Sequence, residues 1–60
     1  MRVYVNQESV DVLPGMTVRH ALIHAGLLEQ IARGKKVYDE WGNEVGEEGE
    51  LSEGIRLTLR

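Results

Sequence analysis

The sequence contains no cysteine, one proline and one tryptophan in 60 residues, and no long apolar run. Without cysteine the chain has no disulfide, no thiolate metal site and no thiol nucleophile. No apolar stretch approaches the roughly 18 residues that a membrane-spanning helix needs. The N-terminal segment 1–6 alternates apolar and polar residues, unlike the apolar core of a signal peptide. We therefore expect a cytoplasmic protein whose fold is held by side-chain packing alone.

The length of the chain predicts a single domain over residues 1–60. A domain of this size buries only about 60% of the surface of its unfolded chain and has little room for a substrate pocket. The sequence contains no Ser/His/Asp arrangement, no glycine-rich phosphate loop and no carboxylate pair in an apolar setting. We therefore expect no catalytic residue, no cofactor and no enzymatic activity.

Negative charge is concentrated in one stretch of the chain. The net charge is −3, and seven of the ten acidic residues lie between positions 39 and 53, where no lysine or arginine occurs. The seven basic residues and the other three acidic ones lie outside this stretch, so we expect a molecular dipole. The acidic stretch lacks the ligand order of a calcium loop, which favours a solvated loop. The overall charge argues against broad binding of nucleic acid.

Two short strands are predicted between residues 1 and 13. Val3 and Val5, and then Val10 and Val12, alternate with polar residues. The polar segment 6–8 suits a hairpin loop between the two strands. One face of this antiparallel pair is aliphatic and the other is polar, as in a half-buried sheet.

A helix is predicted after Pro14-Gly15, with Thr17 as its N-cap and Gly26 as its stop. Its apolar residues recur at helical spacing and form one stripe. The stripe consists of Val18, Ala21, Leu22, Ala25 and Leu28. At least one further helical turn is expected between residues 27 and 33.

The C-terminal half contains a short strand, a long loop and a clear final strand. The third strand is expected within 35–40, followed by a turn at 41–43, a brief return strand at Val45 and a loop over 46–54. The final segment 55–60 alternates aliphatic residues with arginine and threonine, so one of its faces is buried. Placing this strand parallel to the first strand lets the helix cover both. The predicted class is α+β, with a mixed sheet, parallel central first and last strands, and one main helix on one face.

Two motifs in this pattern resemble the β-grasp (ubiquitin-like) superfamily, whose fold is ββαββ. The segment 10–18, with Ala21 and Ala25-Gly26, is similar to the opening of several of its families, and 51–57 is similar to the entry to their last strand. These families include the sulfur carriers of thiamine and molybdopterin synthesis, TGS domains and plant-type ferredoxin domains.

The departures from each family pattern matter for function. Sulfur carriers present a C-terminal Gly-Gly, whereas this sequence ends in Leu57-Thr58-Leu59-Arg60, so the resemblance implies a degenerate or truncated carrier. Ferredoxin domains bind their cluster through four cysteines, which are absent. A TGS-like domain that contacts RNA or a ligand stays open as a second alternative.

The exposed face of the predicted sheet is the main candidate site. Pairing of the first and last strands brings five polar or aromatic residues into one patch, namely Arg2, Tyr4, Arg56, Thr58 and Arg60. Such a patch suits an acidic protein surface or a single-stranded nucleic acid that stacks on Tyr4, although a merely solvated face is nearly as good an interpretation. We expect a non-catalytic protein-interaction or regulatory module that binds another protein, as a monomer or as a weak homodimer through an uncapped edge strand.

Three further features have a structural and a functional interpretation. Trp41 is expected to cover one end of the core, with an interface anchor as the alternative. His20 and His24 share a helical face, but two imidazoles without a third ligand bind zinc weakly, so no metal site is predicted. Ile23, and Leu27 if the helix continues, are expected opposite the core stripe, as ordinary exposed residues or as a contact patch.

Overall fold

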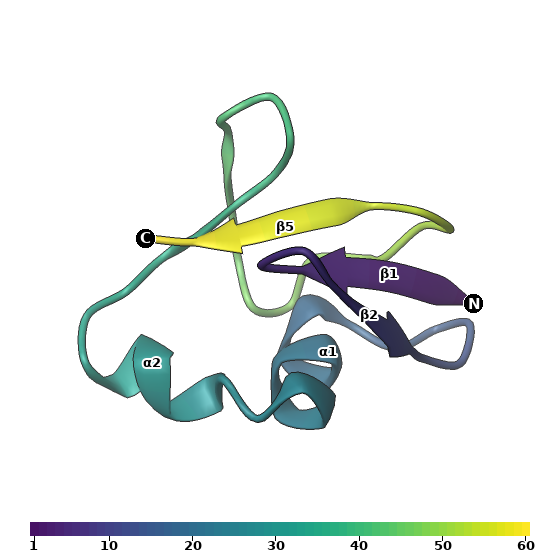
Figure 1. The fold of residues 1–60 in the computed structure, drawn as a ribbon, viewed down its shortest axis with the longest axis horizontal. Helices are drawn as coiled ribbons and strands as arrows, with labels where there is room; N and C mark the ends of the chain where they lie inside the picture. The colour runs from purple at the N-terminus through teal and green to yellow at the C-terminus, as the bar shows by residue number, and fades with distance from the viewer.

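The computed structural model describes all residues, Met1–Arg60, as an α+β fold with a five-stranded mixed sheet and two short helices (Figure 1). The elements are β1 (Arg2–Val5), β2 (Glu8–Asp11), α1 (Val18–Ala25), α2 (Leu28–Ala32), β3 (Val37–Tyr38), β4 (Glu44–Val45) and β5 (Arg56–Leu59). The single main helix of the prediction is thus two short helices, because the further turn expected after Gly26 is a separate helix. Neither helix has the length and apolar character required to cross a membrane.

The strand order across the sheet is β2-β1-β5-β3-β4. β1 and β2 pair antiparallel, while β1 and β5 pair in parallel with Tyr4 opposite Arg56. β3 runs antiparallel to β5 and to β4, with Tyr38 opposite Thr58 on one side and Glu44 on the other. The first and last strands therefore lie side by side in the middle of the sheet, as their alternating sequences predict.

The turn between β1 and β2 also connects the first hairpin to β5. Asn6 and Gln7 both have positive φ angles, 51° and 73°, which the two-residue turn of a twisted hairpin requires. The backbone N–H of Asn6 donates to the carbonyl of Leu57 at 2.9 Å, and its side-chain oxygen accepts from the N–H of Leu59 at 3.0 Å. Asparagine tolerates this left-handed conformation well, whereas glutamine adopts it at a cost.

Helix α1 begins and ends at the residues that the sequence predicts. Thr17 is the N-cap, and its backbone N–H donates to Nδ1 of His20 at 3.0 Å within a capping box. Gly26 ends the helix with a φ of 74°, a left-handed conformation that a side chain would strain. Both ends of this short helix are thus fixed by local geometry.

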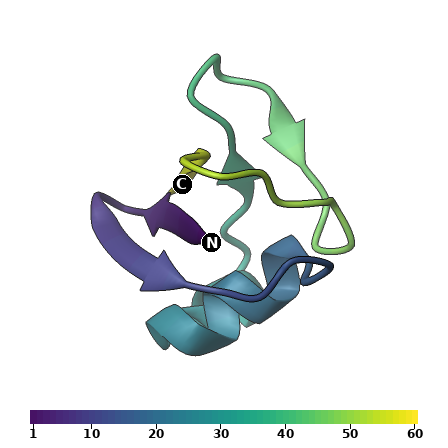
Figure 2. The same cartoon turned by 90° about the vertical axis from the view of Figure 1, so that its right-hand side faces the viewer.

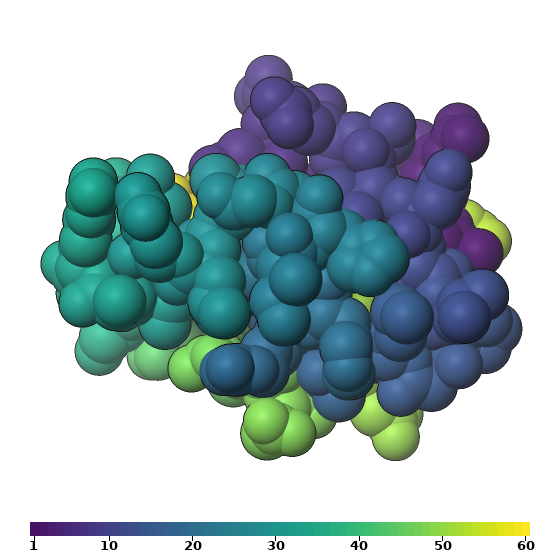
Figure 3. Space-filling model, turned by 90° about the horizontal axis from the view of Figure 1, so that it is seen from below, coloured from purple at the N-terminus to yellow at the C-terminus, as the bar shows by residue number.

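The core lies between the sheet and the two helices, which cover the same side of the sheet (Figures 1 and 2). Its ten buried residues are all apolar, and no polar side chain is buried. The largest fully buried ones come from three elements: Val3 and Val5 of β1, Val18 and Leu22 of α1, and Leu57 of β5. Seen from below, the helices form the left and centre of the visible surface and the blue segment before α1 forms the right, with the light green segment that precedes β5 at the lower border (Figure 3).

The acidic segment is docked onto the start of α1 by its backbone. The N–H of Val18 donates to the carbonyl of Gly49 at 3.0 Å, and the N–H of Arg19 donates to the carbonyl of Glu47 at 2.8 Å. The guanidinium of Arg19 also pairs with the Glu47 carboxylate at 3.1 Å. Loop carbonyls thus satisfy N–H groups that the first helical turn leaves without partners. Most of the glutamates in this segment are exposed, so the predicted solvated loop is confirmed for the side chains but not for the backbone.

Candidate functional site

The surface of the sheet that faces away from the helices carries the predicted patch. Because side chains alternate along a strand, the residues between the buried positions of β1, β3 and β5 share this surface. We call this surface the outer face; it consists of Arg2, Tyr4, Tyr38, Arg56, Thr58 and Arg60. The structure brings together the five residues that the sequence placed here, and it adds Tyr38 to them.

Tyr38 was missed because β3 contains only two residues and has no alternation of its own. A signal was nevertheless present in the neighbouring residue. Val37 is buried, so Tyr38 must point to the opposite face once β3 pairs with β5. The prediction needed the register of that pairing, which the sequence of β3 does not supply.

Two arginines of the outer face lie over tyrosine rings. The Cζ atom of Arg56 is 4.6 Å from the centroid of the Tyr4 ring, and that of Arg60 is 4.7 Å from the centroid of the Tyr38 ring. A guanidinium over an aromatic face is attracted by the ring, by about 0.5–1 kcal/mol at an exposed site. Each ring therefore restricts where its arginine extends, while the N–H groups at the guanidinium edge stay available to a partner.

The arginines of the outer face differ in whether an acidic side chain compensates their charge. Nε of Arg2 lies 3.4 Å from a carboxylate oxygen of Asp11, and its backbone N–H donates to the Glu53 carboxylate at 2.8 Å. Arg56 and Arg60 form no ion pair, because the three ion pairs of the molecule involve Arg2, Arg19 and Arg33. Uncompensated positive charge therefore lies on Arg56, on Arg60 directly after β5, and on the exposed Lys36, whose backbone pairs with that of Arg60.

Acidic residues lie on the two edge strands of the sheet, which β1 and β3 separate from β5. Asp11 lies on β2 opposite Arg2, and Glu44 lies on β4 opposite Tyr38. Register partners share a face of a sheet, so both carboxylates flank the outer face. Both residues are exposed. The unpaired positive side chains thus lie in the middle of the sheet, with carboxylates at its two edges.

Trp41 does not cover the core, and the prediction that it does so is wrong. The residue is 75% exposed and lies in the turn between β3 and β4. A carboxylate oxygen of Asp39 accepts the N–H groups of Trp41 at 3.0 Å and Asn43 at 2.9 Å and so fixes the turn. This hairpin projects away from the helices and hence from the apolar interior (Figures 1 and 2). The alternative interpretation of Trp41, as an interface anchor, stays a prediction.

The chain was compared with protein-family models, with curated proteins and with solved structures. No match was found in any of the three. The function of the outer face is therefore inferred from its residues and their geometry.

The two histidines of α1 have different surroundings. Nδ1 of His20 accepts the N–H of Thr17 at 3.0 Å and lies 3.1 Å from the Thr17 hydroxyl, so this nitrogen belongs to the helix cap. His24 borders an apolar hollow beside Leu13 and Met16. No group of three or more histidine, cysteine, aspartate or glutamate side chains is arranged to hold a metal ion.

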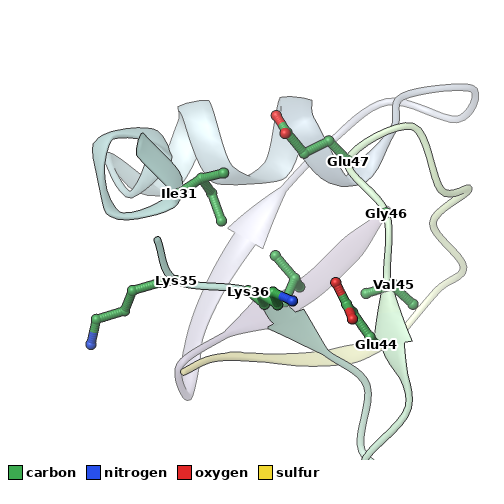
Figure 4. Close-up of a pocket in the computed structure, with 8 residues that line it drawn as sticks. Ile31, Lys35, Lys36, Glu44, Val45, Gly46 and Glu47 are labelled. Atoms are coloured by element: carbon green, nitrogen blue, oxygen red, sulfur yellow. The ribbon is translucent and has the colours of Figure 1, made fainter. Parts of the chain in front are cut away.

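The hollows of the surface are small compared with ligand pockets, which usually measure about 300–1,000 Å³. The one in Figure 4 has about 150 Å³ and lies between α2 and the β3–β4 hairpin, where Ile31 and Val45 are mixed with two lysines and two glutamates. The apolar hollow beside Leu13 has about 260 Å³, and a third has about 220 Å³. None of them reaches the usual size of a small-molecule site.

Exposed aliphatic residues lie on the helix side of the molecule and at the end of β2. Ile23 is 49% exposed, as the helical spacing predicts, and Leu13 is 66% exposed. Leu27, in contrast, packs against the core as a half-buried residue, because α1 ends at Gly26 and the chain changes direction there. These residues do not join the outer face.

Proposed function

We propose that this chain is a β-grasp domain that acts as a non-catalytic protein-interaction module and binds its partner on the outer face. Three features support the β-grasp assignment: the N-terminal hairpin, the parallel pairing of β1 with β5, and the placement of both helices on one side of the sheet. The module needs no pocket, because the binding surface is the open sheet.

The observation that carries the binding role is the pair of arginine–tyrosine stacks on β5 and its neighbours. Arg56 and Arg60 have no carboxylate partner within the molecule, and each is held over an aromatic ring. Tyrosine, tryptophan and arginine are the residues that most often dominate the energy of protein interfaces. A surface that served only solubility would not need to order its arginines in this way.

Trp41 extends the proposed binding surface beyond the sheet. It is the most exposed large hydrophobic residue of the chain, and its hairpin projects toward the same side of the molecule as the outer face. An indole in this position would lose much contact with water when a partner covers it. The proposal therefore includes Trp41 as an apolar anchor next to a polar face.

Affinity capture with charge-reversed variants tests the proposal. Arg56→Glu/Arg60→Glu changes the outer face, and Arg33→Glu/Lys35→Glu changes charge by the same amount in the segment between α2 and β3. Both variants are first checked for folding by circular dichroism. We expect the wild type and the second variant to capture a shared set of proteins that the first variant loses.

A different result would contradict the proposal. If the wild type and both double variants capture the same partners in the same amounts, the outer face is not the binding surface. A Trp41→Ala variant then separates the contribution of the hairpin from that of the sheet.

A further inference from the structure

We infer that the outer face binds an extended acidic peptide whose two carboxylates, four residues apart, meet the guanidinium groups of Arg56 and Arg60. The inference rests on the proposed function and names the chemistry of the partner. It starts from the two stacked arginines, Arg56 in β5 and Arg60 directly after it, which lie on the outer face and have no internal acidic partner.

The spacing of the two arginines sets the spacing of the carboxylates. Tyr4 is opposite Arg56 and Tyr38 is opposite Thr58, so the rings under the two guanidinium groups are offset along β5 by two residues, about 6.6 Å, and lie two strands apart, about 9.6 Å. The two guanidinium groups are therefore about 12 Å apart. In an extended peptide, residues i and i+4 point to the same side and are about 13 Å apart, which matches this distance. Residues i and i+3 point to opposite sides, so one carboxylate of such a pair would face away.

The positions of the two tyrosine rings determine the angle at which the bound peptide crosses the sheet. Tyr4 lies on β1 and draws Arg56 to one side of β5, whereas Tyr38 lies on β3 and draws Arg60 to the other. A line between the two guanidinium groups therefore crosses β5 obliquely. Thr58 lies between them, where its hydroxyl can donate to a peptide carbonyl or accept from a peptide N–H.

The peptide lies on the sheet and does not extend it. β5 is paired with β1 on one side and with β3 on the other, so its backbone groups are already used. Recognition must then come from side chains, chiefly from paired N–H groups of a guanidinium that bind both oxygens of one carboxylate. This requirement selects arginine over lysine at both positions.

The charges around β5 favour a peptide over a nucleic acid. Asp11 and Glu44 lie on the two edge strands, so a nucleic acid that crosses the sheet with a phosphate on every nucleotide would place phosphates next to carboxylates. A peptide with two separated carboxylates avoids both. In addition, a guanidinium occupies one face of each tyrosine ring, which reduces the aromatic surface available to a stacking base.

Titrations with synthetic peptides test the inference. Three nine-residue peptides of identical composition carry their two glutamates at i and i+4, at i and i+3, or side by side. Binding to the whole chain is followed by backbone amide chemical shifts and by Trp41 fluorescence. We expect the i,i+4 peptide to bind about five- to tenfold more tightly than the other two, with the largest shifts in β5, Tyr4 and Tyr38.

Conservative variants distinguish ordered arginines from general positive charge. Arg56→Lys/Arg60→Lys keeps both charges but removes the planar donors, and we expect it to weaken binding of the i,i+4 peptide about tenfold. The matched control, Arg19→Lys/Arg33→Lys, changes two arginines outside the outer face and should leave the affinity unchanged. Both variants retain the net charge, so a difference between them does not come from long-range attraction.

Several results would overturn the inference. Equal affinities for the three peptides, or an unchanged affinity in Arg56→Lys/Arg60→Lys, would mean that only general attraction acts. Tighter binding of a nine-nucleotide single-stranded RNA would assign the face to nucleic acid. Self-association in sedimentation experiments that Arg56→Glu abolishes would make a second copy of the chain the occupant.

The two proposals fail separately. Partners that depend on Arg56 and Arg60 in the capture experiment, together with no preference among the peptides, would keep the interaction module and reject the acidic peptide. Equal capture by all variants would reject the binding role of the outer face itself.

Discussion

The two faces of the sheet differ in what holds their side chains in place. The inner face, under the helices, contributes only apolar side chains, and all ten buried residues of the molecule are aliphatic. The outer face holds no buried residue and orders its side chains through two arginine–tyrosine contacts and one ion pair. Neighbouring residues of one strand, such as Leu57 and Thr58, therefore belong to different environments although they are adjacent in sequence.

This difference separates the residues that stabilise the fold from those that we propose to bind a partner. Burial of aliphatic side chains stabilises by about 1.5–3 kcal/mol for each side chain, whereas exposed ion pairs and cation–π contacts contribute about 1 kcal/mol or less. Substitutions on the inner face should thus change the free energy of unfolding, and those on the outer face should mainly change affinity.

The largest effect is expected at Leu57. The residue is 2% exposed in the centre of the sheet, so Leu57→Ala leaves a cavity and should lower the free energy of unfolding by about 2–4 kcal/mol. A chain of 60 residues has little stability in reserve, so a substantial fraction of the variant should be unfolded at 25 °C. Urea unfolding followed by circular dichroism gives the value.

Thr58→Ala is the matched control, since it alters the next residue on the opposite face. Thr58 is exposed, and the substitution should change the free energy of unfolding by less than about 0.5 kcal/mol. A loss at Thr58 as large as that at Leu57 would contradict the separation of the two faces.

The inner face is the part of the molecule that the sequence predicts best. Val3, Val5, Leu57 and Leu59 alternate with polar residues, and every one of them is buried. This success has a physical reason, because a one-residue shift of either strand would turn the whole aliphatic set toward water. The same argument places Arg2, Tyr4 and Arg56 on the outer face, since they alternate with the buried residues of β1 and β5.

The remainder of the site depends on information that local sequence does not contain. Trp41 is exposed because the β3–β4 hairpin extends beyond the core, and the direction of a hairpin with two-residue strands follows from its pairing with β5. The stacks on Tyr4 and Tyr38 depend on the side-chain rotamers of two arginines. Residue patterns predict which face a side chain occupies, but they do not predict its contacts there.

A smaller effect is expected at His20, in the helix layer that covers the inner face. His20→Ala removes the acceptor of the Thr17 N–H bond, which measures 3.0 Å, and should lower the free energy of unfolding by about 0.5–1 kcal/mol. His20→Glu restores an acceptor and places a negative charge in the first turn of α1, so it should recover the loss. Urea unfolding of both variants at neutral pH measures the effect.

The same pair of variants tests whether the helix layer and the outer face act independently. His20 lies outside the outer face, so peptide affinity should be equal for the wild type, His20→Ala and His20→Glu under conditions in which all three are folded. An affinity that changes together with stability would show that the helix layer and the outer face are coupled.

The smallest effect is expected from the stacks themselves. A double-mutant cycle of Tyr4→Leu and Arg56→Met should give a coupling of about 0.5 kcal/mol in the free energy of unfolding, because the 4.6 Å contact is exposed to water. This coupling adds little to the free energy of unfolding, but it shows whether the Tyr4 ring orders Arg56. A measurable coupling means that Tyr4 orders Arg56 before a partner arrives, so Tyr4→Leu should weaken peptide binding through Arg56 and have little effect when Arg56→Met is already present. If the coupling is zero while Tyr4→Leu still weakens binding in the Arg56→Met background, the ring contacts the partner directly and the arginine is not ordered by it.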